Sequence, residues 1–183
     1  MVNQIKKKSI IMGIDPGTLK CGIGIIQQEK DNLSCIYYET LKASAKLKLS
    51  KRLHIIYKQI NSVIKKYSPD SIAIEQPFVG DNPKSSLAIG QAQAIALISA
   101  EKFSKDIYFY SPTEVKKSVT NYGFSSKEQV AEMVKTLLNL NELPDSDSAD
   151  ALAISICHIY GETNLLNNIQ ILDEIWLSHY QVK

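Results

Sequence analysis

The apolar residues in the first third of the chain fall into short runs that are typical of β-strands. Segments 9–15, 22–28 and 33–43 are rich in Ile and Tyr, and Pro/Gly or Asp/Asn turns separate them, so the pattern predicts three successive strands. Between Leu49 and Tyr67 the apolar residues instead recur every three or four positions. This spacing predicts an amphipathic helix that ends before the turn residues at 68–70.

The middle of the chain predicts two further strands with a helix between them. The runs at 71–76 and 106–111 are short and rich in Ile or aromatic residues, as strands in a sheet often are. The segment 85–103 is dense in Ala and predicts a helix that can pack closely against its neighbours.

Helix starts dominate the last third of the chain. The stretch "SPTE" at 111–114 places Ser at the N-cap, Pro at the first helical position and Glu at the third. A second Ser-led segment opens a helix over 126–140. A further helix begins within "PDSDSADALAI" at 144–154, and we expect it to run to about Tyr160 and stop at Gly161.

This order of elements predicts an α/β fold with a mixed five-stranded sheet flanked by helices. We expect the first three strands to be antiparallel and the strands that follow helices to join them in parallel. A chain of 183 residues suits one domain, which we assign to residues 1–160. The extension 161–183 is weakly amphipathic, and the sequence leaves open whether it is one more helix or an end that binds a partner.

The composition favours a soluble cytoplasmic protein. No apolar run approaches the ~20 residues of a membrane span, and the basic start is followed by an apolar stretch too short for a signal peptide. The cysteines lack CxxC spacing and the histidines lack metal-ligand spacing, so we expect reduced thiols and structural imidazoles. These six residues are Cys21, Cys35, Cys157, His54, His158 and His179.

The positive charge consists almost entirely of lysine. The net charge is only +2, which does not by itself demand a nucleic-acid partner. All 21 basic residues except Arg52 are lysines, and a lysine lacks the two-pronged geometry with which arginine reads a base edge. If this chain binds DNA, we expect it to hold phosphates more than to read bases.

Four carboxylates stand at positions where a purely structural role explains them poorly. Asp15 ends the first predicted strand, where it could also be a simple turn former. Glu75 lies among apolar residues in a predicted buried strand, and a buried carboxylate is costly unless paired or metal-bound. Asp147 and Asp150 are three residues apart and share one face of the last helix. The start of this helix also carries Asp145. Helix capping would account for one or two of these three acids, but not for all of them.

Together these four positions predict a metal site. Four carboxylates that meet in a partly buried place would raise one another's pKa, and a hard divalent cation such as Mg²⁺ or Mn²⁺ would relieve the repulsion. Two such ions about 4 Å apart could activate a water and stabilise the leaving oxygen during phosphodiester hydrolysis. The stretch "GIDPGT" alone would also suit an actin-like ATPase, but 183 residues cannot supply that fold's two lobes.

Several motifs, in order and spacing, resemble those of the RuvC family of bacterial Holliday junction resolvases. They are "GIDPGT", "PDSIAIEQPF", "GQAQA", "EVKKSVTNYGFSSKEQV", "MVKTLL" and "DSADALAISICH", and they extend from about Ile10 to Tyr160. The resemblance implies an RNase H-like fold and a homodimer that cuts two symmetric strands of a four-way DNA junction during recombination and repair. It also implies dependence on Mg²⁺, with Mn²⁺ as a substitute, and a partnership with the RuvAB branch-migration complex.

The resemblance assigns roles to individual residues. The catalytic, metal-holding acids fall on Asp15, Glu75, Asp147 and Asp150, which leaves Asp145 to cap the helix. The DNA-binding positions fall on Lys116 and Lys127, with Lys117 ranked lower, and on Phe78 as an aromatic ring near the junction centre. From the residues alone, the lysines could be solvated side chains near helix starts, and Phe78 could equally be a core residue.

Two departures from the family pattern affect the predicted contacts with DNA. Gln93 in "GQAQA" stands where many members carry Arg, which removes one possible phosphate contact. The loop "GDNPK" at 80–84 differs in its Pro and its acidic residue. The segment Lys6–Lys8 could be a DNA-contacting arm, although a solubilising terminus is the simpler interpretation.

Three other functions remain as rivals. An RNase H-like nuclease that cuts RNA/DNA hybrids would use the same acids. A non-catalytic junction-binding module would not need Asp15 or Glu75. A nucleotide-driven phosphotransferase would have to bind ATP. The sequence leaves open the preferred cleavage sequence and the residues of the dimer interface.

Overall fold

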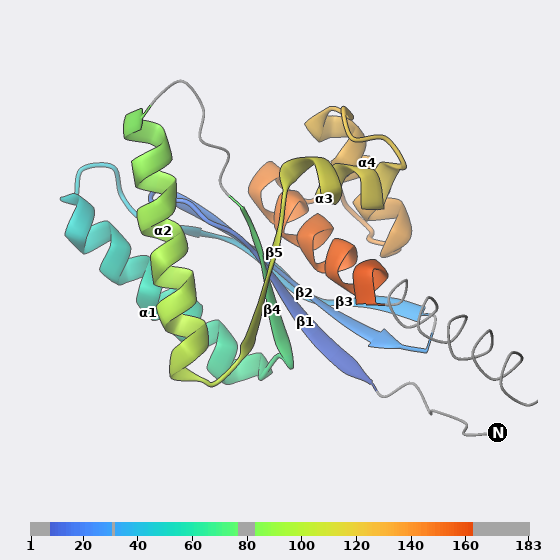
Figure 1. Cartoon of the computed structure of the whole chain (residues 1–183), viewed down its shortest axis with the longest axis horizontal. Helices are drawn as coiled ribbons and strands as arrows, with labels where there is room; N and C mark the ends of the chain where they lie inside the picture. Colours follow the sequence, from blue (N-terminus) through green and yellow to red (C-terminus); the bar gives the residue numbers. More distant parts are fainter. Residues whose placement is uncertain (1–7, 31, 77–82, 163–183) are drawn as a thin grey trace, which may run out of the picture.

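One mixed five-stranded sheet organises the computed structural model of the chain, which describes residues 8–30, 32–76 and 83–162 (Figure 1). The strands lie in the order β3-β2-β1-β4-β5. They are β1 (Ser9–Asp15), β2 (Lys20–Glu29), β3 (Asn32–Lys42), β4 (Ser71–Glu75) and β5 (Asp106–Tyr110). The first three pair antiparallel, whereas β4 is parallel to β1 and β5 is parallel to β4. The predicted sheet is therefore confirmed.

Helices cover both faces of this sheet (Figure 1). One face carries α1 (Leu49–Tyr67) and α2 (Pro83–Lys102), and the other carries α3 (Pro112–Thr120), α4 (Lys127–Leu137) and a helix over residues 146–162. No described helix is both long enough and apolar enough to cross a membrane.

The predicted starts of α3 and α4 are correct, whereas α2 begins at Pro83 and not at residue 85, and two predicted helix ends are wrong. Both α3 and α4 begin with a capping box, in which Ser111 pairs with Glu114 and Ser126 with Gln129. Helix α4 ends at Leu137 and not near residue 140. The 146–162 helix continues through Gly161, because no described glycine adopts the positive φ with which a glycine usually ends a helix.

The sheet separates two apolar clusters. On β1, Met12 and Ile14 are buried in the cluster beneath α1 and α2, and Ile11 is buried in the cluster beneath the other three helices. Because successive strand residues face opposite sides, Gly13 and Asp15 share the face of Ile11. Asp15 therefore points toward the side of the sheet that the 146–162 helix covers.

Three strand glycines let the 146–162 helix lie directly on the sheet. An ideal Cβ would come within 2.0 Å of a helix backbone atom at Gly13, 1.9 Å at Gly22 and 2.6 Å at Gly24. Real Cβ atoms do not approach other atoms so closely, so any larger residue would push the helix away. We call these three residues the glycine floor.

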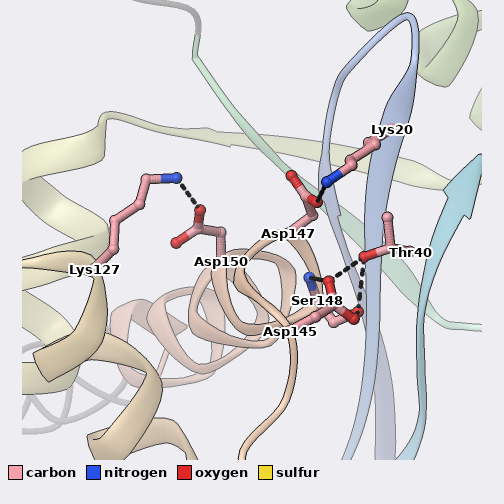
Figure 2. Close-up of polar contacts among 7 residues, drawn as sticks. All are labelled: Lys20, Thr40, Lys127, Asp145, Asp147, Ser148 and Asp150. Atoms are coloured by element: carbon pink, nitrogen blue, oxygen red, sulfur yellow. Dashed lines mark hydrogen bonds and ion pairs between the residues drawn. The ribbon is translucent and has the colours of Figure 1, made fainter.

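Asp145 caps this helix, as predicted, and its contact with Thr40 also ties the helix to β3 (Figure 2). Its carboxylate accepts hydrogen bonds from the Ser148 hydroxyl at 2.9 Å and from the Thr40 hydroxyl. Burial of Asp145 opposes ionisation, but the hydrogen bonds from Thr40 and Ser148 outweigh it and lower the pKa of Asp145. The cap therefore fixes where the helix begins.

The cysteines and His158 have structural surroundings. Cys21 and Cys157 are buried free thiols, and Cys35 is half-buried. His158 is fully buried, with its Nδ1 2.7 Å from the Tyr110 hydroxyl and its Nε2 3.0 Å from the Ser71 hydroxyl. Burial lowers the pKa of His158 to about 4, so it is neutral near pH 7.

Candidate active site

The carboxyl ends of two neighbouring parallel strands bring the first two acids together. Asp15 is the last residue of β1 and Glu75 is the last residue of β4. These strands are paired in parallel, with Ile14 beside Ile74, so the acid that follows each lies at the same edge of the sheet. Both side chains are half-buried.

The glycine floor brings the second pair of acids to the same edge. Asp15 is paired with Gly22 on β2, and a Cβ at Gly22 would lie 1.9 Å from the backbone oxygen of Asp147. The first turn of the 146–162 helix is therefore seated beside Asp15. Asp150 follows Asp147 by three residues and lies on the same side of the helix (Figure 2).

The pKa shifts of the strand acids indicate that the four acids lie close enough to influence one another. Burial raises the pKa of Asp15 to about 8, and the negative charges of the other three acids add to the increase, in the order Glu75, Asp150 and Asp147. Burial also raises the pKa of Glu75, with Asp150 as the next cause. The acidic helix entrance thus has two parts, because Asp145 serves as the cap while the charges of Asp147 and Asp150 act on Asp15.

Two lysines hold the helix acids from opposite sides (Figure 2). Lys127 Nζ lies 2.6 Å from Asp150 Oδ2, and this hydrogen bond raises the pKa of Lys127. Lys20 Nζ lies 3.7 Å from Asp147 Oδ2. Sequence reasoning missed Lys20. The sequence did offer a signal for Lys20, because the first two strands were predicted to be antiparallel. Antiparallel pairing brings the start of β2, where Lys20 lies, next to Asp15 at the end of β1.

The remaining predicted DNA-binding residues lie in different places. The positive charge of Lys116, on α3, acts on Glu75 and so reaches the site. Lys117 lines a separate cavity with Tyr160 and Cys157. Phe78 lies outside the described residues.

The two departures from the family pattern lie at and before α2. Gln93 is half-buried on α2. Within the loop 80–84 only Pro83 and Lys84, at the start of α2, are described. Lys8 is exposed, and Lys6 and Lys7 lie outside the described residues.

The donor set fits a hard divalent cation. All four acids offer oxygen ligands, which Mg²⁺ and Mn²⁺ prefer, and their mutual repulsion is what such an ion would relieve. Among the described residues, no three Asp, Glu, His or Cys side chains already stand in a metal-binding arrangement. Asp147 and Asp150 are instead turned to Lys20 and Lys127, so ion binding requires these two carboxylates to reorient.

Proteins of similar sequence belong to one family. Residues 11–158 match the family model described as crossover junction endodeoxyribonuclease RuvC. A relative of that name from Dehalococcoides mccartyi is 48% identical over 149 residues, which cover 81% of this chain and 90% of the relative. Another from Alkaliphilus oremlandii is 41% identical over 152 residues, covering 82% of this chain and 93% of the relative.

Solved structures agree with the sequence matches. Thermus thermophilus RuvC, determined in complex with a Holliday junction substrate, superposes with a TM-score of 0.80 at 29% identity, covering 85% of this chain and 96% of that one. The yeast mitochondrial Holliday junction resolvase Ydc2 shares the fold with a TM-score of 0.67 at 17% identity, covering 94% of this chain and 89% of that one. These matches confirm the RNase H-like fold, and the chain belongs to the RuvC family of crossover junction endodeoxyribonucleases.

Proposed function

We propose that this protein resolves four-way DNA junctions in recombination and repair by hydrolysing phosphodiester bonds at symmetric sites. The observation that carries the proposal is the cluster of four mutually repelling acids at one edge of the sheet. Family membership supports the same substrate, since the similar Thermus thermophilus protein binds a Holliday junction.

We assign the holding of divalent metal to Asp15, Glu75, Asp147 and Asp150. Mg²⁺ is the expected ion, with Mn²⁺ as a substitute and two ions in each site. When bound, such ions activate the attacking water and stabilise the leaving oxygen in phosphodiester hydrolysis. The half-buried acids would hold the ions in a fixed place, because they come from two paired strands and a helix seated on the sheet.

The lysines act on the phosphate in this proposal. Lys127 and Lys116 bring positive charge to the site from two different helices, and a phosphate is a natural partner for both. Lys127 would then exchange its bond to Asp150 for one to the DNA, which frees Asp150 for the metal. Lys117 adds positive charge farther along the bound DNA strand. Phe78 unstacks bases near the junction centre.

A homodimer would present two such sites to the symmetric junction. On α2, Leu87 is 65% exposed and Ile98 is 57% exposed, and the exposed Ala94 lies between them at helical spacing. A Cβ added to Gly90 would have no neighbour within 4 Å, so this helix face is open. We propose that a second copy of the chain covers the stripe Leu87–Ala94–Ile98 through a two-fold interface.

Three further proposals rest on family membership and composition. The protein works in the cytoplasm and cooperates with the RuvAB branch-migration complex. Residues 1–160 form the nuclease domain and residues 161–183 an extension, most of which lies outside the described residues. Truncation after residue 162 should leave cleavage of an isolated junction unchanged, and a loss of that cleavage would contradict the domain assignment.

The decisive experiment is cleavage of a synthetic mobile junction with Mg²⁺. The wild-type protein should cut it symmetrically, and Asp147→Asn should bind it while cutting at least ~100-fold more slowly, because several kcal/mol of metal stabilisation are lost. An RNA/DNA hybrid of matched length should stay intact.

Each rival function predicts a different result. Preferred cutting of the hybrid would indicate an RNase H-type nuclease. Junction binding with no cleavage by the wild type, and unchanged function in Asp15→Asn and Glu75→Gln, would indicate a binding module. Calorimetric binding of ATP would indicate a phosphotransferase.

A further inference from the structure

An exposed aromatic pair, Tyr122 and Phe124, precedes Lys127 by a few residues and has no role in the site described so far. Phe124 is 81% exposed and Tyr122 is 61% exposed, although large apolar side chains are usually inside a protein. The two ring centroids are 5.7 Å apart, with the rings tilted by 58°. Both residues belong to the connection between α3 and α4.

Hydrogen bonds hold this connection in one shape. The buried Ser125 donates from its hydroxyl to the Tyr122 carbonyl at 2.9 Å, and the same hydroxyl lies 2.7 Å from Thr120 Oγ1. A Cβ at Gly123 would lie 2.8 Å from the Thr113 methyl group, so the backbone is packed directly on α3. The rings are therefore presented on a preorganised support, which lowers the entropic cost of binding.

The aromatic pair lies close along the chain to the two lysines that act on the acids. Phe124 precedes Lys127 by three residues, a Cα separation of at most about 11 Å, and Lys127 reaches Asp150 at 2.6 Å. On the other side, the Lys116 carbonyl accepts a 2.8 Å hydrogen bond from the Thr120 hydroxyl, next to the same loop. The chain thus carries exposed rings within a few residues of two lysines, and proteins combine aromatic and cationic side chains to hold single-stranded nucleic acid.

We propose that Tyr122 and Phe124 form a stacking platform for an unpaired base of the substrate, adjacent to the phosphate that is cut. The platform deepens the proposed function, on which it rests. The lysines take the phosphates while the rings take the neighbouring base, so the strand is held at two kinds of point. A branch point offers bases without a continuous stack on both sides, and a continuous duplex does not.

Substitutions at Phe124 test whether aromatic stacking matters. Phe124→Ala should weaken binding of the junction roughly 5- to 150-fold, the range expected for one lost base–aromatic stack, and Tyr122→Ala should do the same. Phe124→Trp should retain binding, whereas Phe124→Leu, which keeps an apolar group without a π-face, should not. Phe109→Ala is the matched control, because Phe109 is 42% exposed on β5 and outside this loop.

Photocrosslinking tests the contact directly. A junction that carries 5-iodouracil at successive positions beside the cut should, in EDTA, crosslink to Tyr122 or Phe124 on irradiation. Peptide mass spectrometry identifies the attachment site. The crosslink should vanish in the Tyr122→Ala/Phe124→Ala double variant and persist in Phe109→Ala.

The failures of the two proposals are distinguishable. If the wild type does not cut the junction, the proposed function fails. If it cuts the junction, but Phe124→Ala and Tyr122→Ala bind as tightly as wild type and no position crosslinks to the loop, the platform is refuted. A change in the sedimentation of the loop variants would assign the rings to an interface between copies, which also overturns the platform.

Discussion

Asp15 is the residue at which burial and the other three acids act together. Its pKa is raised to about 8, so the metal-free protein holds a proton there over a range where an ordinary aspartate is ionised. The position of Asp15 at a strand end, and its relation to Glu75, Asp147 and Asp150, could be predicted from the sequence. The sizes of the electrostatic effects could not, because they depend on how deeply each side chain is buried.

The raised pKa of Asp15 predicts how metal-free stability depends on pH. The folded state keeps a proton that the unfolded chain releases above about pH 4, so stability is fully present below that pH and is lost as pH rises through about 8. In EDTA, the free energy of unfolding that urea titration gives for the wild type should fall between pH 6.5 and 8.5 relative to Asp15→Asn, by at most ~1.4 kcal/mol per pH unit. Taking the difference cancels the contribution of the buried His158.

Parallel pH profiles for the wild type and Asp15→Asn would contradict this coupling. The same proteins in saturating Mg²⁺ provide the control, since an ion that neutralises the site should remove the pH dependence of the wild type. Mg²⁺ should also raise the melting temperature of the wild type more than that of Asp15→Asn.

Lys20 should compete with the metal for Asp147, which it contacts at 3.7 Å. Without DNA, Lys20→Ala should therefore lower the Mg²⁺ concentration that half-stabilises the protein in a melting assay. Lys20 is exposed and the contact is long, so its loss should change metal-free stability by less than ~1 kcal/mol. Lys42→Ala is the control. It removes the same charge from the neighbouring position on β3, which is paired with Lys20. Equal Mg²⁺ midpoints in the two variants would show that Lys20 does not compete.

At the level of elements, the sequence predicted every described strand and helix but not how one helix approaches the sheet. Periodicity and capping residues located the elements because those signals are local. The glycine floor was not predicted, since a strand glycine in a single sequence looks like a weak strand residue. Its role depends on a helix more than 120 residues away, as with Gly24 and Leu152. The prediction that the last helix stops at Gly161 was wrong for a similar reason. A glycine need not end a helix that contacts other parts of the fold.

A methyl group on the glycine floor should damage stability and cleavage together. Gly24→Ala would place its Cβ 2.6 Å from the Leu152 nitrogen, and such overpacking typically costs about 1–3 kcal/mol. Because the helix must move, Asp147 and Asp150 lose register with the strand acids, and cleavage should fall on the order of 100-fold. Urea unfolding and single-turnover cleavage measure the two effects.

Gly161→Ala is the control on the same helix. Its Cβ would meet the Tyr110 side chain at an ordinary 3.8 Å, so the substitution should be neutral or stabilise the helix by up to ~1 kcal/mol. Normal cleavage by Gly24→Ala, or equal losses in both variants, would argue against the floor.

At the level of the whole molecule, the exposed stripe on α2 is the feature that a single-domain interpretation of the sequence left unexplained. Composition identified 85–103 as a closely packing helix, but which side would stay open depends on how α1 and the sheet cover it. The structure leaves Leu87 and Ile98 uncovered. The residues of a dimer interface could not be derived from the sequence, because an apolar helix position looks the same whether it faces the core or a partner.

The dimer proposal predicts that a charge on this stripe separates the subunits. Ile98→Glu should sediment as a monomer, because a charge is costly to bury in an apolar interface, and it should nick junctions on one strand instead of resolving them symmetrically. Leu143→Glu is a suitable control, since Leu143 is 49% exposed and lies outside α2. If Ile98→Glu remains a dimer, the interface does not lie on this stripe and the proposal is wrong.

The glycine floor also bears on how sequence variation in this protein should be read. Half of the acidic cluster owes its location to the absence of side chains on two strands, so uncharged positions help to decide where the acids stand. A survey of random variants should therefore find inactive proteins at Gly13, Gly22 and Gly24 as readily as at the acids. Alanine scanning, usually the mildest probe of a residue, would be a severe one at these three positions.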